Sequence, residues 1–284
     1  MNVHPLTNNP TDVWKELSKF QKFEKVKHNK PSHPVAADKL RIVCVSDTHS
    51  LTNHIKFKIP DGDVLIHAGD VSQCGRVEEI IDFNDWLGKL PHKHKIVIAG
   101  NHELSFDEDF KCSQKSNKGN KIPTFGIPKH KIEEAIASPS PKQYLSNCIY
   151  LEDSEIVLYG IKFYGTPWQP KFHNWAFNLP RGEKCLEKWN QIPDDTDILI
   201  THTPPLGHGD YCYTGVRAGC VELLQTIQKR VKPKYHIFGH IHEGYGTTTD
   251  GNTVFVNAST CDIYYNPVNE PIVFDISLPP GVKK

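Results

Sequence analysis

Short apolar runs rich in valine and isoleucine recur along the chain from about residue 40 to residue 277. Near-continuous runs of this kind are typical of strands in a sheet that is covered on both faces. The runs are RIVCVSD (41–47), DVLIHAGD (63–70), HKIVIAGN (94–101), TDILITHT (196–203), YHIFGHIH (235–242), TVFVNAS (253–259) and PIVFDIS (271–277). The stretch IYLEDSEIVLYGIKFYGTP (149–167) has the pattern of a hairpin. The chain is therefore expected to contain a sheet-rich domain.

Helical patterns alternate with these strands. Residues 76–90 and 219–231 carry apolar side chains near helical spacing. Strand, helix, strand units predict an α/β domain. Residues 105–147 are polar and rich in Ser, Lys and Pro, and we expect them to be partly loop.

Residues 1–38 are expected to form a helical and linker appendage to this domain. Val13, Leu17 and Phe20 recur near helical spacing, and the polar stretch KHNKPSHPVAAD follows them. We therefore expect the main domain to cover residues 39–284.

Polar residues gather where the predicted strands end. SDTHS ends the first strand, HAGDVS the second, AGNHE the third, ITHTPP a later one and FGHIH another. Ligands usually bind at the carboxyl ends of strands in α/β sheets, because loops there carry the chemistry while the sheet fixes their position. We expect the five strand ends to meet in one crevice. The polar side chains at these ends are Asp47, His49, Asp70, Asn101, His102, His202, His240 and His242.

The side-chain types in this set predict a metal site. Residues i and i+2 of an extended chain point to the same side, so Asp47 and His49 are placed to bind one cation. Carboxylate and imidazole ligands without thiolate suit Mn, Fe or Zn, and two cations that share one carboxylate use more of the set than a single tetrahedral ion. Each motif alone is also typical of an ordinary turn, but two histidines beside a glycine in GHIH (239–242) are costly to bury unused.

Composition narrows the function classes. The 284 residues contain 33 Lys and Arg against 33 Asp and Glu, so no overall basic field attracts nucleic acid or an anionic membrane. No stretch approaches the roughly 18 apolar residues of a membrane span, and no signal-peptide pattern opens the chain. The eight cysteines are scattered without a CxxC pair, which indicates reduced thiols and a cytoplasmic protein.

The ordered set Asp-x-His, Gly-Asp, Gly-Asn-His-Glu, His and Gly-His-x-His resembles the calcineurin-like metallophosphoesterase superfamily. HAGDVSQCG, IAGNHELSFD, GTPWQPKFHNWAFN, HTPPLGHGD and FGHIHEGYG are similar to the metallophosphoesterase-domain-containing (UPF0046) proteins of animals, close to the class III cyclic-nucleotide phosphodiesterases. The resemblance covers about residues 40–260. It implies an α/β fold of the metallophosphoesterase type, a four-layer αββα sandwich with two mixed β-sheets.

The resemblance also implies a role for each residue of the set. Two divalent metal ions would be bound, Mn²⁺ in preference to Fe or Zn. The first metal would be held by Asp47, His49 and His242, the second by Asn101, His202 and His240, and Asp70 would bridge the two. His102 would stand beside the metals, as a general acid, as a hydrogen-bond donor to the phosphate, or as a partner of a metal-bound carboxylate.

The implied reaction is hydrolysis of small phosphodiesters, with 2′,3′- or 3′,5′-cyclic nucleotides as candidate substrates. Two cations about 3.5 to 4 Å apart lower the pKa of a bridging water, so that the resulting hydroxide attacks, and they neutralise the phosphate oxygens. A phosphomonoesterase or nucleotidase with the same site is an alternative, and a weakly active metal-binding adaptor is another. Nucleic acid is a less expected substrate, because the positive and negative side chains of the protein are equal in number.

Four further residues are candidates for substrate contact. His67 lies on a predicted strand, where a core histidine is the alternative. Trp168 and His173, in PWQPKFHNW, either wall a pocket for a nucleobase or pack over its rim. Arg217 either contacts an anionic substrate or forms a salt bridge. Beside them, Glu103 either orients an imidazole or is a solvated loop carboxylate.

Overall fold

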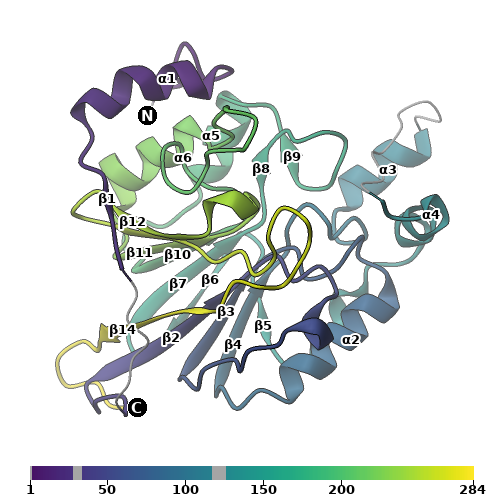
Figure 1. The fold of residues 1–284 in the computed structure, drawn as a ribbon, viewed down its shortest axis with the longest axis horizontal. Helices are drawn as coiled ribbons and strands as arrows, with labels where there is room; N and C mark the ends of the chain where they lie inside the picture. The colour runs from purple at the N-terminus through teal and green to yellow at the C-terminus, as the bar shows by residue number, and fades with distance from the viewer. Residues whose placement is uncertain (1, 28–33, 117–125) are drawn as a thin grey trace.

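The computed structural model describes residues 2–27, 34–116 and 126–284, and it has four layers (Figure 1). Two sheets pack face to face, and helices cover the outer face of each. This arrangement confirms the predicted αββα sandwich with two mixed sheets. Residues 28–33 of the expected linker and 117–125 of the expected loop lie outside the described residues.

The smaller sheet has the strand order β14-β2-β3-β4-β5. Its strands are β2 (Lys39–Val45), β3 (Val64–Ala68), β4 (His94–Ile98), β5 (Ile149–Tyr150) and β14 (Ile272–Ser277). β2 to β5 are mutually parallel, and β14 runs antiparallel to β2 at the edge. Three parallel neighbours, β2, β3 and β4, therefore end at the same side of the sheet.

The larger sheet has the order β1-β12-β13-β11-β10-β7-β6. Its strands are β1 (Glu24–Lys25), β6 (Ser154–Leu158), β7 (Ile161–Thr166), β10 (Ile198–Thr201), β11 (Tyr235–Phe238), β12 (Gly246–Thr249) and β13 (Val254–Asn257). The central four are parallel, and the edges are antiparallel. The predicted hairpin is β6–β7, and its two-residue turn has positive φ at Tyr159 (52°) and Gly160 (73°), as a tight hairpin requires. A small pair, β8 (Gln169–Pro170) and β9 (Asn178–Leu179), lies outside both sheets.

The alternation of side chains along β2 shows why its run is almost wholly apolar. Ile42 and Cys44 pack in the core between the sheets, whereas Val43 and Val45 pack in the core under the helices. Successive side chains of a strand point to opposite faces, so a sheet with both faces buried needs apolar residues at every position.

Helices cover the two outer faces. α2 (Val77–Gly88) and α4 (Lys129–Ala137) contribute side chains to the core over the smaller sheet, and α5 (Glu183–Trp189) and α6 (Val221–Thr226) to the core over the larger sheet. A π-helical turn, Ile227–Val231, extends α6, so both predicted helices are confirmed. The remaining helical segments are α1 (Pro10–Leu17), α3 (Glu108–Ser116) and the 3₁₀ turns Ser18–Phe20, Thr52–His54, Pro141–Tyr144 and His242–Gly244.

The N-terminal segment packs on the larger sheet's side of the molecule, with α1 above α6 (Figure 1). Val13 is fully buried in a small core with Leu206, Val221 and Leu224, and β1 pairs two residues with β12 and forms the edge of the larger sheet. The division into an appendage of residues 1–38 and a domain of residues 39–284 stays a prediction.

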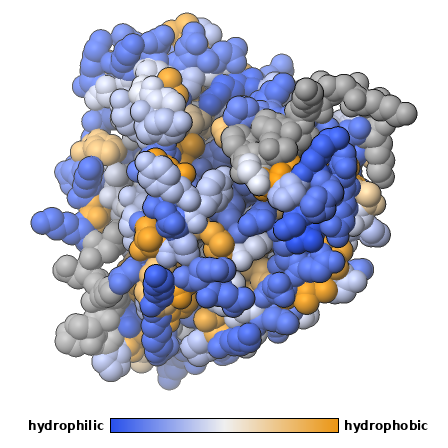
Figure 2. Space-filling model, turned by 45° about the vertical axis from the view of Figure 1, so that its right-hand side comes forward, coloured by the Kyte–Doolittle hydropathy of each residue, from blue (hydrophilic) through white to orange (hydrophobic). Residues whose placement is uncertain are grey.

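The visible face in Figure 2 is mostly hydrophilic, with hydrophobic residues scattered among polar ones. Among the residues that the structure describes, no helix is both long and apolar enough to cross a membrane.

The two sheets approach each other where their parallel strands end. Ser46, directly after β2, forms an isolated bridge with Ser259, which follows β13 in the other sheet. The Thr260 amide donates a hydrogen bond of 2.8 Å to the Ser46 carbonyl. Strand ends from both sheets are thereby held at one place.

Candidate metal centre

The structure brings together the polar side chains that follow five strands. Their potential ligand atoms form three groups, and within each group the atoms lie within 4.8 Å of one another. The groups are Asp47–His49–His242, His49–Asp70–His102 and Asp70–His202–His240. Because Asp70 and His49 each belong to two groups, the three groups form one continuous cluster. Asn101 joins it through its side-chain oxygen, 3.1 Å from His202 Nε2.

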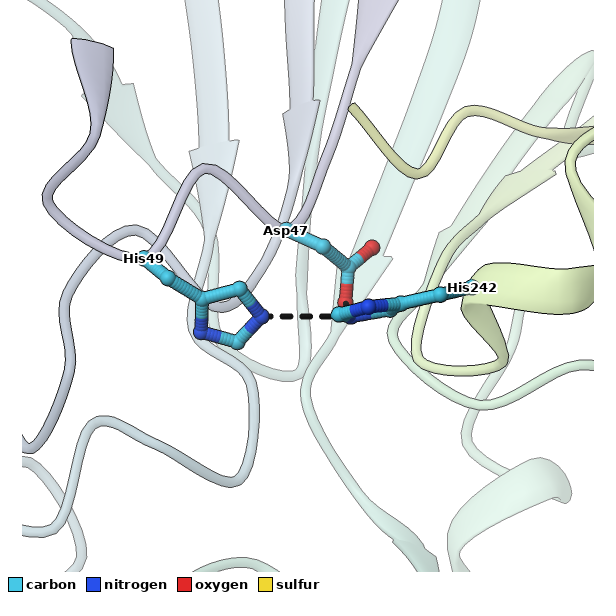
Figure 3. Close-up of side chains that lie close together, drawn as sticks. All are labelled: Asp47, His49 and His242. Carbon is cyan, nitrogen blue, oxygen red and sulfur yellow. Dashed lines mark hydrogen bonds and ion pairs between the residues drawn. The ribbon is translucent and has the colours of Figure 1, made fainter. Parts of the chain in front are cut away.

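Asp47 and His49 extend from the turn after β2 toward His242, which begins the facing 3₁₀ turn His242–Gly244 (Figure 3). His49 Nε2 lies 3.2 Å from His242 Nε2, and His242 Nε2 lies 3.5 Å from Asp47 Oδ1. His242 Nδ1 is 2.8 Å from the Asp262 carbonyl oxygen. A carbonyl only accepts, so Nδ1 carries the proton and Nε2 presents a lone pair when the ring is neutral.

The second half of the cluster repeats this arrangement. His202 Nδ1 donates to the Ala68 carbonyl at 2.9 Å, so its Nε2 faces the cluster. That Nε2 lies 3.2 Å from Asp70 Oδ2 as well as close to the Asn101 oxygen. The His240 ring packs edge-on against the His202 ring, with 5.0 Å between centroids.

This concentration of lone pairs fits divalent cations. Asp47 is 0% and Asp70 2% exposed, and buried carboxylates without a compensating positive charge are costly. Burial lowers the pKa of His202, but Asp70, Asp47 and the Ala68 carbonyl together outweigh burial and raise this pKa to about 9. A cation that binds at His202 Nε2 would therefore displace a proton. Burial lowers the pKa of His240 to about 3, which leaves that ring neutral and able to bind a cation. Carboxylate, imidazole and amide donors together suit Mn, Fe or Zn.

The backbone at the cluster is held in an unusual conformation. Asp47, His49, Asp70 and His240 have φ values of 51°, 45°, 54° and 67°. This left-handed region is sparsely populated by residues other than glycine, and it persists only where surrounding structure enforces it. The Asp47 amide donates to the Gly69 carbonyl and the His49 amide to the Asp70 carbonyl, each at 3.0 Å. The backbone from which these candidate ligand side chains extend is therefore held by hydrogen bonds between the loops.

Glu103 is a buried support of two loops. Its carboxylate accepts hydrogen bonds from the backbone amides of Asp70 (3.0 Å) and Gly100 (2.7 Å), and from the amide (3.0 Å) and hydroxyl (2.7 Å) of Ser72. Glu103 thus joins the loop after β3 to the loop after β4. The sequence suggested an imidazole partner or a solvated carboxylate, and the structure shows backbone contacts instead.

His102 lies at the edge of the cluster. Its backbone amide donates to Asp70 Oδ1 at 2.9 Å, and its Nδ1 donates to the Gln73 carbonyl at 2.7 Å. Its Nε2 lies 3.9 Å from Asp70 Oδ2. The ring packs against Trp175, with 4.3 Å between centroids. The buried indole therefore fixes the plane of this imidazole.

Two of the candidate substrate contacts have partners within the protein. His67 lies in the core, where Nε2 is 2.9 Å from Thr48 Oγ1 and the ring meets Phe83 edge-on. Arg217 forms an ion pair with buried Asp210, and its guanidinium lies 4.8 Å from the Trp14 ring centroid. Both residues thus have internal contacts, and their roles as substrate contacts stay a prediction.

The aromatic stretch 167–175 reaches the cluster through residues that the sequence did not single out. Trp168 donates to Asp153 at 2.9 Å and lies under Lys188, and His173 is exposed on a loop beside Phe172. Phe172 meets His240 edge-on at 5.1 Å, and Trp175 packs on His102.

Ser259 and Asp262 are further contacts that the sequence did not indicate. Ser259 Oγ donates to Asp47 Oδ2 at 2.9 Å, and the Asp262 carbonyl accepts from His242. The run TVFVNAS is predicted as a strand, and Ser259 is the polar residue at its end. Because the other site residues also follow strands, this position could have indicated that Ser259 belongs to the site. A backbone carbonyl leaves no such signal in a sequence.

Gly239→Ala is expected to weaken cation binding by about 10- to 100-fold, because a Cβ at this position would lie 2.0 Å from Asp47 Oδ2 and 2.2 Å from Ser46 Oγ. Titration calorimetry with Mn²⁺ measures the change, and circular dichroism checks the fold. Gly281→Ala is the control for backbone strain alone, because its φ is 82° but its Cβ would meet nothing within 4 Å. Wild-type affinity in Gly239→Ala would show that Asp47 does not hold the cation.

Comparisons with known proteins agree with this geometry. The family model for calcineurin-like phosphoesterase matches residues 40–244. The chain is 51% identical over 260 residues to human metallophosphoesterase domain-containing protein 1, covering 91% of this chain and 77% of that protein. It is 48% identical over 290 residues to UPF0046 protein T07D4.2 of Caenorhabditis elegans, covering 100% of this chain and 72% of that protein.

A second Caenorhabditis elegans relative, UPF0046 protein C25E10.12, is 47% identical over 287 residues and covers 99% of this chain and 97% of that protein. A solved crystal structure superposes on 85% of this chain and on the whole of its own, with a TM-score of 0.50 at 15% identity, which bears on the fold alone. The chain belongs to the calcineurin-like phosphoesterase family, within its group of UPF0046 and metallophosphoesterase-domain-containing proteins.

Proposed function

We propose that this protein is a binuclear metal-dependent phosphodiesterase that hydrolyses small phosphodiesters. The supporting observation is the continuous cluster of three largely buried groups of potential ligands, in which Asp70 takes part twice. One tetrahedral ion needs four ligands, and the cluster together with Asn101 supplies more than that. Two ions that share the Asp70 carboxylate would use the potential ligands of both halves of the cluster.

The proposed ligand roles follow the two halves of the cluster. Asp47, His49 and His242 hold the first cation, Asn101, His202 and His240 hold the second, and Asp70 lies between them. We propose Mn²⁺ as the cation, with Fe or Zn as alternatives of the same ligand chemistry. When bound, two such cations make a nucleophile available from water at neutral pH and neutralise the phosphate oxygens.

The remaining steps depend on residues of the chain. His102 presents Nε2 toward the cluster because its Nδ1 is committed to the Gln73 carbonyl. In its protonated form it donates a proton to the leaving oxygen, or it orients the phosphate by a hydrogen bond. Glu103 and Ser259 hold the loops and the Asp47 carboxylate in place, so that the geometry does not reorganise during the reaction.

The substrate class and compartment are also proposed. Cyclic nucleotides are the candidate diesters, on the strength of the family resemblance, and the neutral charge balance disfavours nucleic acid. A cytoplasmic location is supported by the buried cysteines Cys44, Cys74, Cys185, Cys220 and Cys261, which are free thiols.

One assay tests the function. The purified protein with Mn²⁺ is offered bis(p-nitrophenyl) phosphate, p-nitrophenyl phosphate and a panel of cyclic nucleotides, and metal content is measured by elemental analysis. We expect faster turnover of the diesters than of the monoester. Preference for the monoester would identify a phosphomonoesterase or nucleotidase. Full metal occupancy without turnover would identify a metal-binding adaptor.

A further inference from the structure

A pocket of about 320 Å³ opens beside the cluster, next to His49 and His102. Its other walls include Leu51, Ile127 and Tyr265, with Gln73 as a polar member. Pockets for small ligands begin at about 300 Å³, so this one has room for a compact group and not for a polymer. It lies on the side of the cluster where His102 stands.

The position of His102 indicates which part of a substrate would enter this pocket. If His102 acts on the leaving oxygen, the group attached to that oxygen extends past His102, away from the cations. The pocket that begins at His102 is therefore the place for the leaving ester group. This step rests on the function proposed above.

Tyr265 is fixed in this wall by a tight turn. The Tyr265 amide donates to the Asp262 carbonyl at 3.0 Å, and the Asp262 carboxylate accepts from the amides of Tyr264 and Asn266, each at 2.9 Å. The same Asp262 carbonyl accepts from His242 Nδ1. The turn that orients a proposed metal ligand thus also sets the position of the tyrosine.

The conformation of Tyr265 is unusual for an aromatic residue. Its φ is 61°, in the region that bulky side chains rarely adopt, and such strain gathers at functional sites. The ring meets His49 edge-on at 4.8 Å and His242 at 5.4 Å between centroids. It is nevertheless 38% exposed, so part of the ring surface remains open toward the pocket and solvent.

We propose that this pocket binds a planar, largely apolar ester group of the substrate, and that Tyr265 determines specificity by packing against it. Leu51 and Ile127 supply further apolar surface, and Gln73 offers a polar contact for a heteroatom on the ring. Aryl esters have this chemistry directly and nucleoside esters have it in the base attached to the sugar, whereas short alkyl esters do not.

Binding of two phosphonates to the Mn²⁺-loaded protein tests the proposal without turnover. Phenylphosphonate and methylphosphonate present the same anionic group to the cations and differ in the ring. Calorimetry is expected to show phenylphosphonate binding about tenfold more tightly to the wild type, from apolar burial and ring packing. Tyr265→Ala should lose most of this preference, and Tyr265→Phe should keep it.

Tyr264→Ala is the matched control, because its neighbouring ring is 77% exposed and does not line the pocket. If Tyr265→Ala fails to load Mn²⁺, Ile127→Ala tests the proposal in its place. This variant is expected to bind phenylphosphonate about threefold or more weakly, with no such loss of affinity for methylphosphonate. Equal affinities of the wild type for both ligands, or equal losses for both in the variants, would overturn the proposal. A wild type that prefers phenylphosphonate but hydrolyses no diester would support the pocket and refute the proposed function.

Discussion

Asp70→Ala is expected to remove cation binding and phosphodiester hydrolysis together. Asp70 Oδ2 lies 3.2 Å from His202 Nε2 and 4.0 Å from His49 Nε2, so this carboxylate faces ligands of both proposed cations. Its removal takes one ligand from each cation and half of the buried carboxylate charge of the cluster. We expect hydrolysis of bis(p-nitrophenyl) phosphate to fall by at least about 10³-fold, and elemental analysis to find neither cation after gel filtration.

Thermal unfolding gives a second measurement that does not depend on activity. A ligand that binds only the folded state stabilises it by about 2.7 kcal/mol at 100 times its dissociation constant. The melting temperature of the wild type should therefore rise with Mn²⁺ concentration, and that of Asp70→Ala should not. Asp61→Asn is a control, because this carboxylate is exposed on the surface beside Lys58. Two cations retained in Asp70→Ala would show that Asp70 does not bridge them.

The strands and the place of the site could be predicted because both leave local signals. A strand buried on both faces needs apolar residues at successive positions, and β2, β3 and β4 have them. Parallel strands also end at one side of a sheet, so the polar residues after them must lie near one another. That reasoning predicts that Asp47, Asp70 and Asn101 are neighbours without any knowledge of distances.

Two strands at one end of the larger sheet, β1 and β12, left no comparable signal. β12 is Gly246–Thr249, a run of glycine and threonines, and β1 has two exposed residues. Short, partly solvated strands of this kind need no apolar run. Their pairing depends on neighbours that are distant along the chain, as in Glu24 with Thr249.

The supporting contacts of the site were hidden for a similar reason. Glu103 holds backbone amides near Asp70, about 30 positions earlier in the chain, and Tyr265 is positioned by a turn whose key acceptor is a carbonyl. A sequence shows which side chains are present, but it does not show which backbone groups they meet. The ion pair of Arg217 with Asp210 likewise depends on an irregular loop that brings the two side chains together.

His102→Ala is expected to slow hydrolysis by about 10²- to 10⁴-fold with both cations retained. His102 is also close enough to His49 and Asp70 to count as a potential ligand, so metal content separates the two roles. Its Nε2 is 3.9 Å from Asp70 Oδ2, a distance that leaves room for a substrate oxygen to approach. Elemental analysis with unchanged stoichiometry, beside a reduced kcat, is the result that the proposed role requires.

The leaving group then separates proton donation from orientation of the phosphate. A p-nitrophenolate leaves without protonation, whereas the alkoxide leaving group of a cyclic nucleotide needs a proton. If His102 is the general acid, His102→Ala should slow cyclic-nucleotide hydrolysis by about tenfold or more beyond its effect on bis(p-nitrophenyl) phosphate. His102→Gln keeps a hydrogen-bond donor that cannot transfer a proton, and it should behave like the alanine variant with alkyl esters. Equal losses for both substrates, together with recovery in His102→Gln, would assign the residue to orienting the phosphate instead.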